Sequence, residues 1–403
     1  MAAQGAPILV AQQNFQREQR MKPFDLSAAT FLTSASIFCA ACSSVPMDGD
    51  ATSDVDSAQE ELRHAGPPCA LAHADDEGRV TDLGFFDSAP YGLRYSFAQA
   101  VNDRKTVVGH ALTQVSPELN QQHAFRWKPR TGMVDLGTLA GGFYSIATDV
   151  NDRDQVVGNA DLPGGNQHAV LWDARGRIRD LGTLGGDSSY AYKINNRGQV
   201  LGSSTNADNE FRVFIWEAQT GMVELDLPGV SYASLTGFND SGVIVGGWVK
   251  EGSSYTMPFR WTKAEGGTEL DLLGGSRGEA TAINEQGDIV GFIYDTKVVA
   301  VKWSGTRAVR LRSLPDREEH YPIGQIESFP RAINRRGFIA GSDTTDSDLT
   351  AIQWTSPNHV ERLPLGAIQS DAFDLNNRGD IVGGYFAAGM ADWHGFLWEP
   401  RGH

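Results

Sequence analysis

Cysteine is scarce in this 403-residue chain, and all of it lies near the beginning. The three cysteines are Cys39, Cys42 and Cys69, so no thiol occurs after residue 69. That long remainder therefore has no disulfide, no thiolate metal site and no cysteine nucleophile. Its stability has to come from packing.

Positive charge and long apolar runs are also in short supply. Lys and Arg number 34 against 50 Asp and Glu, which gives a formal net charge of −16. This balance argues against a nucleic-acid partner, which needs a basic surface, and against contact of the folded part with anionic lipid. It favours neutral or cationic ligands. One mildly apolar run, Leu26 to Ala41, is too short and too rich in Ser, Thr and Ala for a membrane span.

What the sequence does contain is a unit that recurs seven times. In each copy an Asn ends one apolar run, a short turn follows, and a second apolar run ends on a Gly. A further apolar run downstream ends in Trp. The turn residues are Asn102, Asn151, Asn195, Asn239, Asn284, Asn334 and Asn376, and the Trp residues are Trp127, Trp172, Trp216, Trp261, Trp303, Trp354 and Trp398. Their period of 42–50 residues predicts a repeat architecture.

One copy, residues 145–181, indicates what each unit forms. Alternating apolar and polar residues predict strands at 145–150, 155–159, 168–172 and 178–181, joined by short turns. Four short strands at this period are typical of one antiparallel propeller blade. The sequence therefore predicts an all-β fold, a seven-bladed β-propeller of four-stranded antiparallel blades.

The two ends of the repeated part complement each other. Only five residues follow Trp398, so the last unit lacks its fourth strand. Near the start, Asp82-Leu83-Gly84 matches the fourth-strand run Asp180-Leu181-Gly182. We therefore expect the N-terminal strand to complete the last blade, which removes the free edge of an open array. The propeller is placed at residues 79–403.

Three motifs also resemble a known family. They are His-Ala-Phe-Arg-Trp at 123–127, Asp-Leu-Gly-Thr-Leu-Gly-Gly at 180–186 and Ile-Asn-Glu-Gln-Gly-Asp-Ile-Val-Gly at 283–291. They are similar to the HAF family of bacterial extracellular repeats. The resemblance implies export and a propeller-like fold, and it brings no assigned chemistry. Units five and six depart from it at 311–314 and 363–366.

The first 78 residues have a different composition. Residues 1–42 combine basic residues, a short apolar run and a small-residue exit, as in an export signal, and Met21 is a natural start for it. The exit resembles a bacterial lipoprotein signal in which Cys42 carries the lipid; ordinary cleavage and an uncleaved segment are the alternatives. Residues 43–78 predict a flexible acidic tether. We expect an exported protein, either a lipoprotein of the cell surface or outer membrane, or a periplasmic or extracellular protein.

A search for chemistry in the repeats finds no established catalytic or metal motif. His123, His168 and His394 share one slot that other units fill with Met or Val, so a strand position is favoured over a metal ligand. The Asp-rich stretch from Asp343 to Asp348 lacks the glycine and terminal carboxylate of a calcium loop. We expect no metal and no cofactor, and assign no catalytic residue.

Two insertions predict which face carries function. In a four-strand blade, the loop between strands two and three and the connection to the next blade open on the same face. The insertions, a lengthened loop from Ala111 to Gln122 and the connection from Pro315 to Pro322, belong to that face. Candidate binding residues there are Tyr144, Tyr190, Tyr232, Arg277, Glu279, His320 and Tyr321. The alternative for the tyrosines is packing between blades.

The preferred function is a binding module for an extracellular glycan, peptide or envelope protein. The alternative is a polysaccharide hydrolase or lyase, with an acidic pair at the channel mouth drawn from Glu279, Glu318, Glu319 and Asp371. A structural role in an envelope assembly is a third possibility. We expect a monomer that meets a membrane only through an N-terminal lipid. An enzyme should show converging carboxylates with raised pKa values, and a binding module an aromatic, mostly neutral face.

Overall fold

The computed structural model describes residues 78–86, 94–116, 119–305, 307–315, 327–345, 348–390 and 392–401. All of them belong to one compact unit, residues 65–403. The predicted signal region with Cys42, and the predicted tether up to residue 77, lie outside the described residues.

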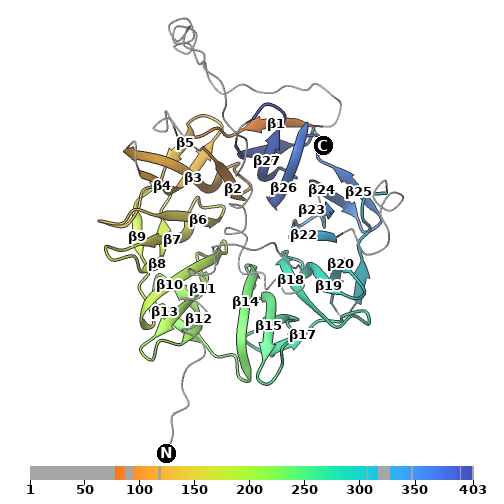
Figure 1. The fold of residues 1–403 in the computed structure, drawn as a ribbon. Helices are drawn as coiled ribbons and strands as arrows, with labels where there is room; N and C mark the ends of the chain where they lie inside the picture. Colours follow the sequence, from red (N-terminus) through yellow and green to blue (C-terminus); the bar gives the residue numbers. More distant parts are fainter. Residues whose placement is uncertain are drawn as a thin grey trace, which may run out of the picture. The chain divides into compact units, whose positions relative to one another are not determined.

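The described residues form 28 strands in seven four-stranded antiparallel sheets, arranged around a common centre (Figure 1). This is the seven-bladed β-propeller that the repeat predicts. Blade 1 consists of β2 (Ser96–Val101), β3 (Val107–Ser116), β4 (Leu119–Lys128) and β5 (Gly132–Asp135). Blade 2 consists of β6 (Ser145–Val150), β7 (Val156–Asp161), β8 (Gln167–Trp172) and β9 (Ile178–Asp180). Blade 3 consists of β10 (Gly185–Ile194), β11 (Val200–Asn206), β12 (Phe211–Glu217) and β13 (Gly221–Leu225).

The remaining blades repeat the same strand order. Blade 4 consists of β14 (Val230–Phe238), β15 (Ile244–Lys250), β16 (Met257–Thr262) and β17 (Gly266–Glu269). Blade 5 consists of β18 (Arg277–Ile283), β19 (Asp288–Tyr294), β20 (Val298–Ser304) and β21 (Arg307–Arg310). Blade 6 consists of β22 (Glu327–Ile333), β23 (Ile339–Thr345), β24 (Asp348–Ser356) and β25 (His359–Arg362). Blade 7 consists of β26 (Ala367–Leu375), β27 (Ile381–Ala387), β28 (His394–Glu399) and β1 (Arg79–Asp82).

The first strand of each blade is innermost, and the seven innermost strands surround a central channel (Figure 1). Each of them ends at one of the repeated Asn turns. We call the side with these turns the turn face. The opposite side, where the innermost strands begin and where the loops between the second and third strands lie, is the loop face.

Packing between neighbouring blades forms the core. The third-strand residues Trp172, Trp303 and Trp354 are almost completely buried. Their indole N–H groups donate to backbone carbonyl groups of the preceding blade at 2.9, 2.7 and 2.6 Å. Each of these Trp side chains therefore buries a large apolar area while its polar atom keeps a partner.

Every innermost strand carries a β-bulge three residues before its Asn. In each case the pairing register with the second strand shifts by one residue at this point. A bulge bends the strand and redirects the side chains that follow it. The bulged residues are Gln99, Thr148, Tyr192, Thr236, Thr281, Arg331 and Phe373. No sequence pattern predicted this feature.

The fourth strand of blade 7 is β1, which lies antiparallel to β28 with Val80 opposite Trp398. A repeated contact accompanies this pairing. In blades 1 and 2, the third-strand histidines His123 and His168 bind the fourth-strand carboxylates of Asp135 and Asp180 at 2.8 and 2.9 Å. In blade 7 the equivalent contact joins His394 to Asp82 of β1 at 2.8 Å, across the two ends of the propeller. These histidines are strand residues held by carboxylates.

The insertion in blade 1 differs from its prediction as a loop from Ala111 to Gln122. The strands β3 and β4 continue through most of it, with Leu112 opposite Gln122 and Thr113 opposite Gln121. The reason is local: Thr113 and Val115 favour a strand, so the extra residues lengthen a hairpin. The second insertion, from Pro315 to Pro322, lies outside the described residues except for Pro315.

Candidate functional site

The turn face is closed by a ring of hydrogen bonds. The side-chain amide of each turn Asn donates to the backbone carbonyl of the turn Asn in the next blade, at 2.8–3.2 Å. The last link runs from Asn376 of blade 7 to Asn102 of blade 1. Each Asn Oδ1 also accepts the backbone N–H groups two and four residues later. The Asn residues therefore stabilise both their own turns and the contact between blades.

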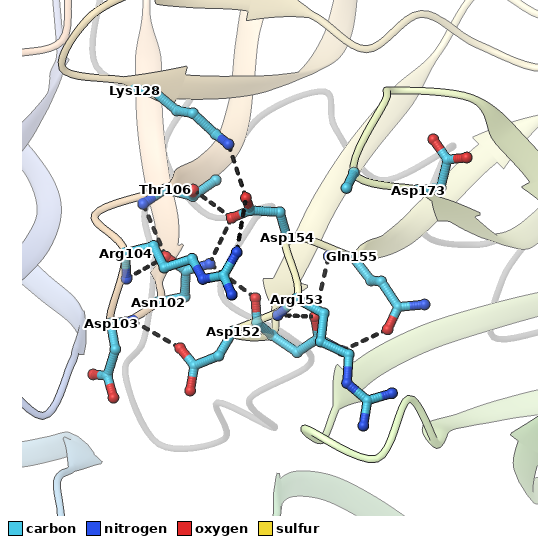
Figure 2. A network of polar contacts seen from close by, with 12 residues as sticks. Asn102, Asp103, Arg104, Thr106, Lys128, Asp152, Arg153, Asp154, Gln155 and Asp173 are labelled. Atoms are coloured by element: carbon cyan, nitrogen blue, oxygen red, sulfur yellow. Dashed lines mark hydrogen bonds and ion pairs between the residues drawn. The ribbon is translucent and has the colours of Figure 1, made fainter.

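Figure 2 shows one of these blade junctions. The Asp154 side chain accepts hydrogen bonds from Asn102, Thr106 and Lys128 of the preceding blade at 3.0, 2.6 and 2.9 Å. Burial alone would raise the pKa of Asp154, but these hydrogen bonds outweigh burial and hold the pKa below its ordinary value. Asp154 has a φ of 60°, where five other units have Gly. The unfavourable backbone conformation is thus compensated by contacts across the junction.

The ring surrounds a cavity of about 170 Å³, lined by the Asn turns and by the ends of all seven innermost strands. Asp374 lines this cavity, and Asp149 and Lys193 occupy the same position of their own strands, two residues before the Asn. The other four strands have small residues there: Ala100, Gly237, Ala282 and Ala332. Three charged side chains therefore share a channel that is otherwise lined by small residues at this level.

Both carboxylates of this group link neighbouring blades. Asp149 accepts the backbone N–H of Ile194 at 2.8 Å, and Asp374 accepts that of Val101 at 2.9 Å. Burial raises the pKa of Asp374 to about 7, against the charge of Lys193 and with a contribution from Asp149. Burial also raises the pKa of Asp149. Because blades 3 and 7 are not neighbours, the effect of Lys193 on Asp374 acts across the channel.

The Asp374→Asn variant tests this carboxylate. The folded protein holds the Asp374 proton up to about pH 7, whereas the unfolded chain releases it near 3.8. The stability that the protonated Asp374 carboxyl group gives to the folded wild type is therefore fully present below about pH 4, and it is lost as the pH rises to about 7. The difference corresponds to at most ~4 kcal/mol, and residual contact with channel water reduces it. We expect the variant, which keeps the Val101 acceptor, to gain about 2 kcal/mol relative to wild type above about pH 7.

Urea unfolding at about pH 4.5 and about pH 8 measures this gain. A Ser241→Ala variant, in an exposed turn position, is the control and should track wild type at both values. An Asp374→Asn advantage that is equal at both pH values would contradict the assignment.

At the loop face, the innermost strands present a second set of side chains around the channel. The residues four and six positions before each Asn are mostly small and buried between blades. Because side chains alternate along a strand, the residues three, five and seven positions before the Asn lie on the other face and stay partly accessible. They include Tyr95, Phe97, Tyr144, Tyr190, Tyr192, Tyr232, Arg277, Glu279, Phe329, Arg331 and Phe373. Asp371, at one of these positions, is buried.

The structure brings Tyr144, Tyr190, Tyr232 and Glu279 into one row across blades 2 to 5. Burial is the main cause that raises the pKa of Tyr144, with a contribution from Tyr190 nearby. Burial likewise raises the pKa of Tyr192 to about 12, with contributions from Tyr232 and Tyr190. For Tyr232, burial raises the pKa and Glu279 adds to the effect. Tyr144 thus lies near Tyr190, Tyr192 lies near both Tyr190 and Tyr232, and Tyr232 lies near Glu279.

The lengthened hairpin of blade 1 extends this row. The hydroxyl of Tyr95 donates to Gln122 Oε1 at 2.7 Å, and Gln122 Nε2 approaches the hydroxyl of Tyr144 at 3.4 Å. Gln122 lies on β4, within the insertion. The insertion therefore contributes to the predicted face, although as a strand.

Glu279 is the carboxylate of the row. It accepts a hydrogen bond from the Ser234 hydroxyl, and burial raises its pKa against the influence of Ser234 and Arg331. Within the described ranges it has no ion pair. Arg331, on the next blade, reaches Asp371 at 3.5 Å, and its buried Nε has no partner in the described part of the chain.

The Arg277 side chain packs on its own blade and does not join the row. Its guanidinium lies 4.2 Å from the ring centroid of Tyr294, a cation–π contact on its own blade. Its side chain is exposed at the edge of the channel mouth.

A cluster of aromatic residues occupies the junction of blades 7 and 1. Phe97 packs on His110, Trp393 and Phe373 with ring centroids 5.6, 5.7 and 6.4 Å apart. Burial lowers the pKa of His110 to about 4, and its Nδ1 has no partner among the described residues. His110 is therefore neutral at physiological pH and belongs to the apolar part of the mouth.

Of the predicted residues, His320 and Tyr321 lie outside the described residues, as do Glu318 and Glu319. The sequence reading missed Tyr95, Phe97, Tyr192, Arg331 and Phe373. Each of them stands three, five or seven residues before a turn Asn, so a comparison of these positions in all seven units would have found them. Within the described part of the chain, no group of three or more His, Cys, Asp or Glu side chains is placed to hold a metal ion. None of the described segments forms a helix that could span a membrane.

Comparison with protein-family models and with curated proteins finds no match to this sequence. Solved structures do match its fold. The propeller domain of the trilobed protease from Pyrococcus furiosus has a TM-score of 0.54 at 9% identity, over 77% of this chain and 97% of that one. The acylaminoacyl peptidase from Pyrococcus horikoshii has a TM-score of 0.53 at 11% identity, over 79% of this chain and 54% of that one. At these identities the similarity shows the fold alone, and the fold is a β-propeller.

Proposed function

We propose that the protein is an exported binding module of the HAF-repeat type, which holds an extracellular glycan across the loop-face mouth of its channel. One observation carries the proposal. Among the described residues, seven large apolar side chains are exposed, and five of them lie on the loop face: Phe143, Phe211, Tyr232, Tyr255 and Ile368. The other two, Val134 and Val223, lie on outermost strands. Such a one-sided distribution is typical of an interaction surface.

The chemistry of the mouth favours a largely neutral ligand. The tyrosine row offers flat apolar rings, and the hydroxyl groups of Tyr190 and Tyr232 have no hydrogen-bond partner within the described ranges. Among the residues three, five and seven positions before each Asn, the acidic Glu279, Glu327 and Asp371 are largely offset by Arg277 and Arg331, so these positions carry only a small net negative charge. Rings for stacking, together with a few convergent polar groups, are the usual composition of a ligand site, and sugars present both an apolar ring face and hydroxyl groups.

A glycan array followed by calorimetry tests the proposal. We expect Tyr190→Ala and Tyr232→Ala each to weaken binding of the best array ligand by about tenfold to a hundredfold, because aromatic contacts in a binding surface carry much of its affinity. Val223→Ala, which removes an exposed large apolar side chain on the outermost strand β13, is the control and should change affinity little. Equal loss in all three variants, or in none, would contradict a site at the row.

A second candidate is hydrolysis or β-elimination of a polysaccharide. The observation that favours it is the raised pKa of Glu279 at the mouth, as expected of a general acid. The same array ligands, assayed for release of reducing ends, distinguish the two. Retention without product supports the binding module, and product formation that Glu279→Gln abolishes supports the enzyme.

A further inference from the structure

The repeated turns carry a pattern of arginines that the scaffold does not use. The second residue after the Asn is Arg in blades 1, 2, 3, 6 and 7, and blade 6 has another Arg before it. These six residues, which we call the arginine arc, are Arg104, Arg153, Arg197, Arg335, Arg336 and Arg378. All six are exposed.

The arc is continuous in space. Blades 6, 7, 1, 2 and 3 follow one another around the ring, because the Asn ring links blade 7 directly to blade 1. In the remaining sector, blades 4 and 5 have Ser241 and Gln286 at the equivalent position. Two further exposed arginines, Arg130 and Arg175, lie in the outer hairpin turns of blades 1 and 2 on the same face.

The guanidinium groups of the arc are largely free. Within the described ranges, the only ion pair of the six is Arg104 with Asp154 at 4.0 Å, and the Arg104 side chain remains 64% exposed. Figure 2 shows Arg104 lying over the junction, whereas the Arg153 side chain extends away from it. These arginines therefore contribute little to holding the blades together.

The acidic residues closest to the arc are already engaged with backbone groups. Asp152 accepts the N–H of Asp103, and Asp103 accepts both the N–H and the side-chain amide of Asn377, at 2.8–2.9 Å. Asp240 and Glu285 make the same contacts in blades 4 and 5, outside the arc. The carboxylates thus line the centre of the turn face together with Arg335, and the other five arginines of the arc are not among the residues that line it.

We propose that the arginine arc is a docking surface for a membrane that contains anionic lipid. Arg104, Arg153, Arg197, Arg336 and Arg378 occupy equivalent turn positions on a rigid ring, so their guanidinium groups lie at a similar height, and a planar array of headgroups can meet all five at once. A linear polyanion would have to curve around the channel to do so. None of the exposed large apolar side chains lies in an Asn turn, so the association is electrostatic. The net charge of −16 argued against contact with anionic lipid. A net charge does not describe how the charged residues are distributed between the two faces of the propeller.

Docking in this way would direct the loop face, with its tyrosine row, away from the lipid. The surface is independent of the proposed glycan site, because no arc residue lies on the loop face. Each basic side chain near an anionic surface contributes about fivefold to binding, so removal of three should cost on the order of a hundredfold.

The test is sedimentation of the full chain with vesicles of phosphatidylcholine alone or mixed equally with phosphatidylglycerol. We expect binding to the mixed vesicles only, and its loss in high salt, which screens exposed charges. The triple variant Arg153→Gln, Arg197→Gln, Arg378→Gln should bind about a hundredfold more weakly, and the corresponding triple Lys variant should retain binding.

A matched control removes three positive charges at positions away from the arginine arc. Arg212, Arg260 and Arg310 each form an ion pair away from the Asn turns, and their triple Gln variant should bind like wild type. The N-terminal segment is present in every variant, so differences report on the arc. Equal binding by the arc variant and wild type would overturn the proposal. So would equal loss in the control, or wild-type binding to soluble alginate without binding to vesicles.

Discussion

A chain that begins at Gly84 is expected to lose cooperative folding, whereas a chain that begins at Gly78 should keep it. The difference between the two is β1 and Leu83. Leu83 is 3% exposed and packs in a core cluster with residues of blades 1 and 7, and a buried leucine contributes about 2–5 kcal/mol. Val80 packs against the core of blade 7. Because total stabilities are about 5–15 kcal/mol, loss of the whole strand approaches the stability of the domain.

Two polar contacts add to this cost. Asp82 accepts hydrogen bonds from His394 at 2.8 Å and from Tyr385 at 3.2 Å. Without β1, these two side chains lose their acceptor, and β28 presents an open edge that favours aggregation. Circular dichroism on heating and size-exclusion chromatography measure the outcome. Identical melting of the two truncated chains would show that the ring does not depend on β1.

A single substitution gives a graded version of the same experiment. Leu83→Ala in the full chain should lower the free energy of unfolding by about 2–5 kcal/mol. Arg79→Ala, on the exposed outer end of β1, should change it by less than about 0.5 kcal/mol.

Replacing one turn Asn by Ala is expected to cost about 3 kcal/mol, which is large for one polar side chain. In wild type, Asn239 donates to the carbonyl of Asn284 at 3.1 Å and accepts from the N–H groups of Ser241 and Val243 at 3.1 and 3.0 Å. Asn239 is 3% exposed, so Asn239→Ala leaves three groups without partners. Each such group costs about 1–3 kcal/mol when buried, and partial access to water keeps the sum near the lower end.

The isosteric variant Asn239→Asp separates the two roles of the side chain. It keeps the acceptor for the turn and loses the donor to the next blade, so at neutral pH it should be less stable than wild type by about 1–2 kcal/mol. The deficit should shrink in acid, where a protonated carboxyl group can donate again. Ser241→Ala, in the same turn, is the control. An Asn239→Ala variant as stable as this control would mean that the hydrogen bond from Asn239 to the next blade does not stabilise the fold.

Much of the fold followed from the sequence because each blade is specified by short-range patterns. The Asn turns, the third-strand Trp residues and the alternation within strands predicted seven four-stranded sheets, and the structure confirms them. The bulge before every Asn was not predictable, because the bulged position holds residues as different as Thr148, Tyr192 and Phe373. The feature that all seven share is its position, three residues before the Asn, and it becomes visible only in the pairing of the first and second strands.

The Asn side chains likewise combine one role that the local sequence specifies with another that depends on the assembled ring. Asn at a turn is expected from its local hydrogen bonding, and the sequence reading took it as scaffold. Its second function, the amide bond to the next blade, depends on two residues about one repeat apart. The missing glycines of units 1 and 2 have a similar explanation. Lys105 and Asp154 both have positive φ. Each forms an ion pair with the preceding blade: Lys105 with Glu399, and Asp154 with Lys128.

The candidate site was only partly predictable. Tyr144, Tyr190, Tyr232 and Glu279 were selected because they precede Asn turns on one face, and the structure places them in one row. Asp149, Lys193 and Asp374 escaped notice because charged residues before a turn are usually exposed. Their meeting in the channel depends on closure of the ring.

The pairing of β1 with β28 also sets an order of events during biosynthesis. The ribosome makes β1 first and its partner last, so the two strands are separated by the entire synthesis of the propeller. Blade 7 cannot be complete until the C-terminal residues have emerged, and until then both edges remain open to other chains. A product stalled or truncated before β28 would therefore expose the same pairing surface on every molecule, and closure of the ring has to wait until β28 has left the ribosome.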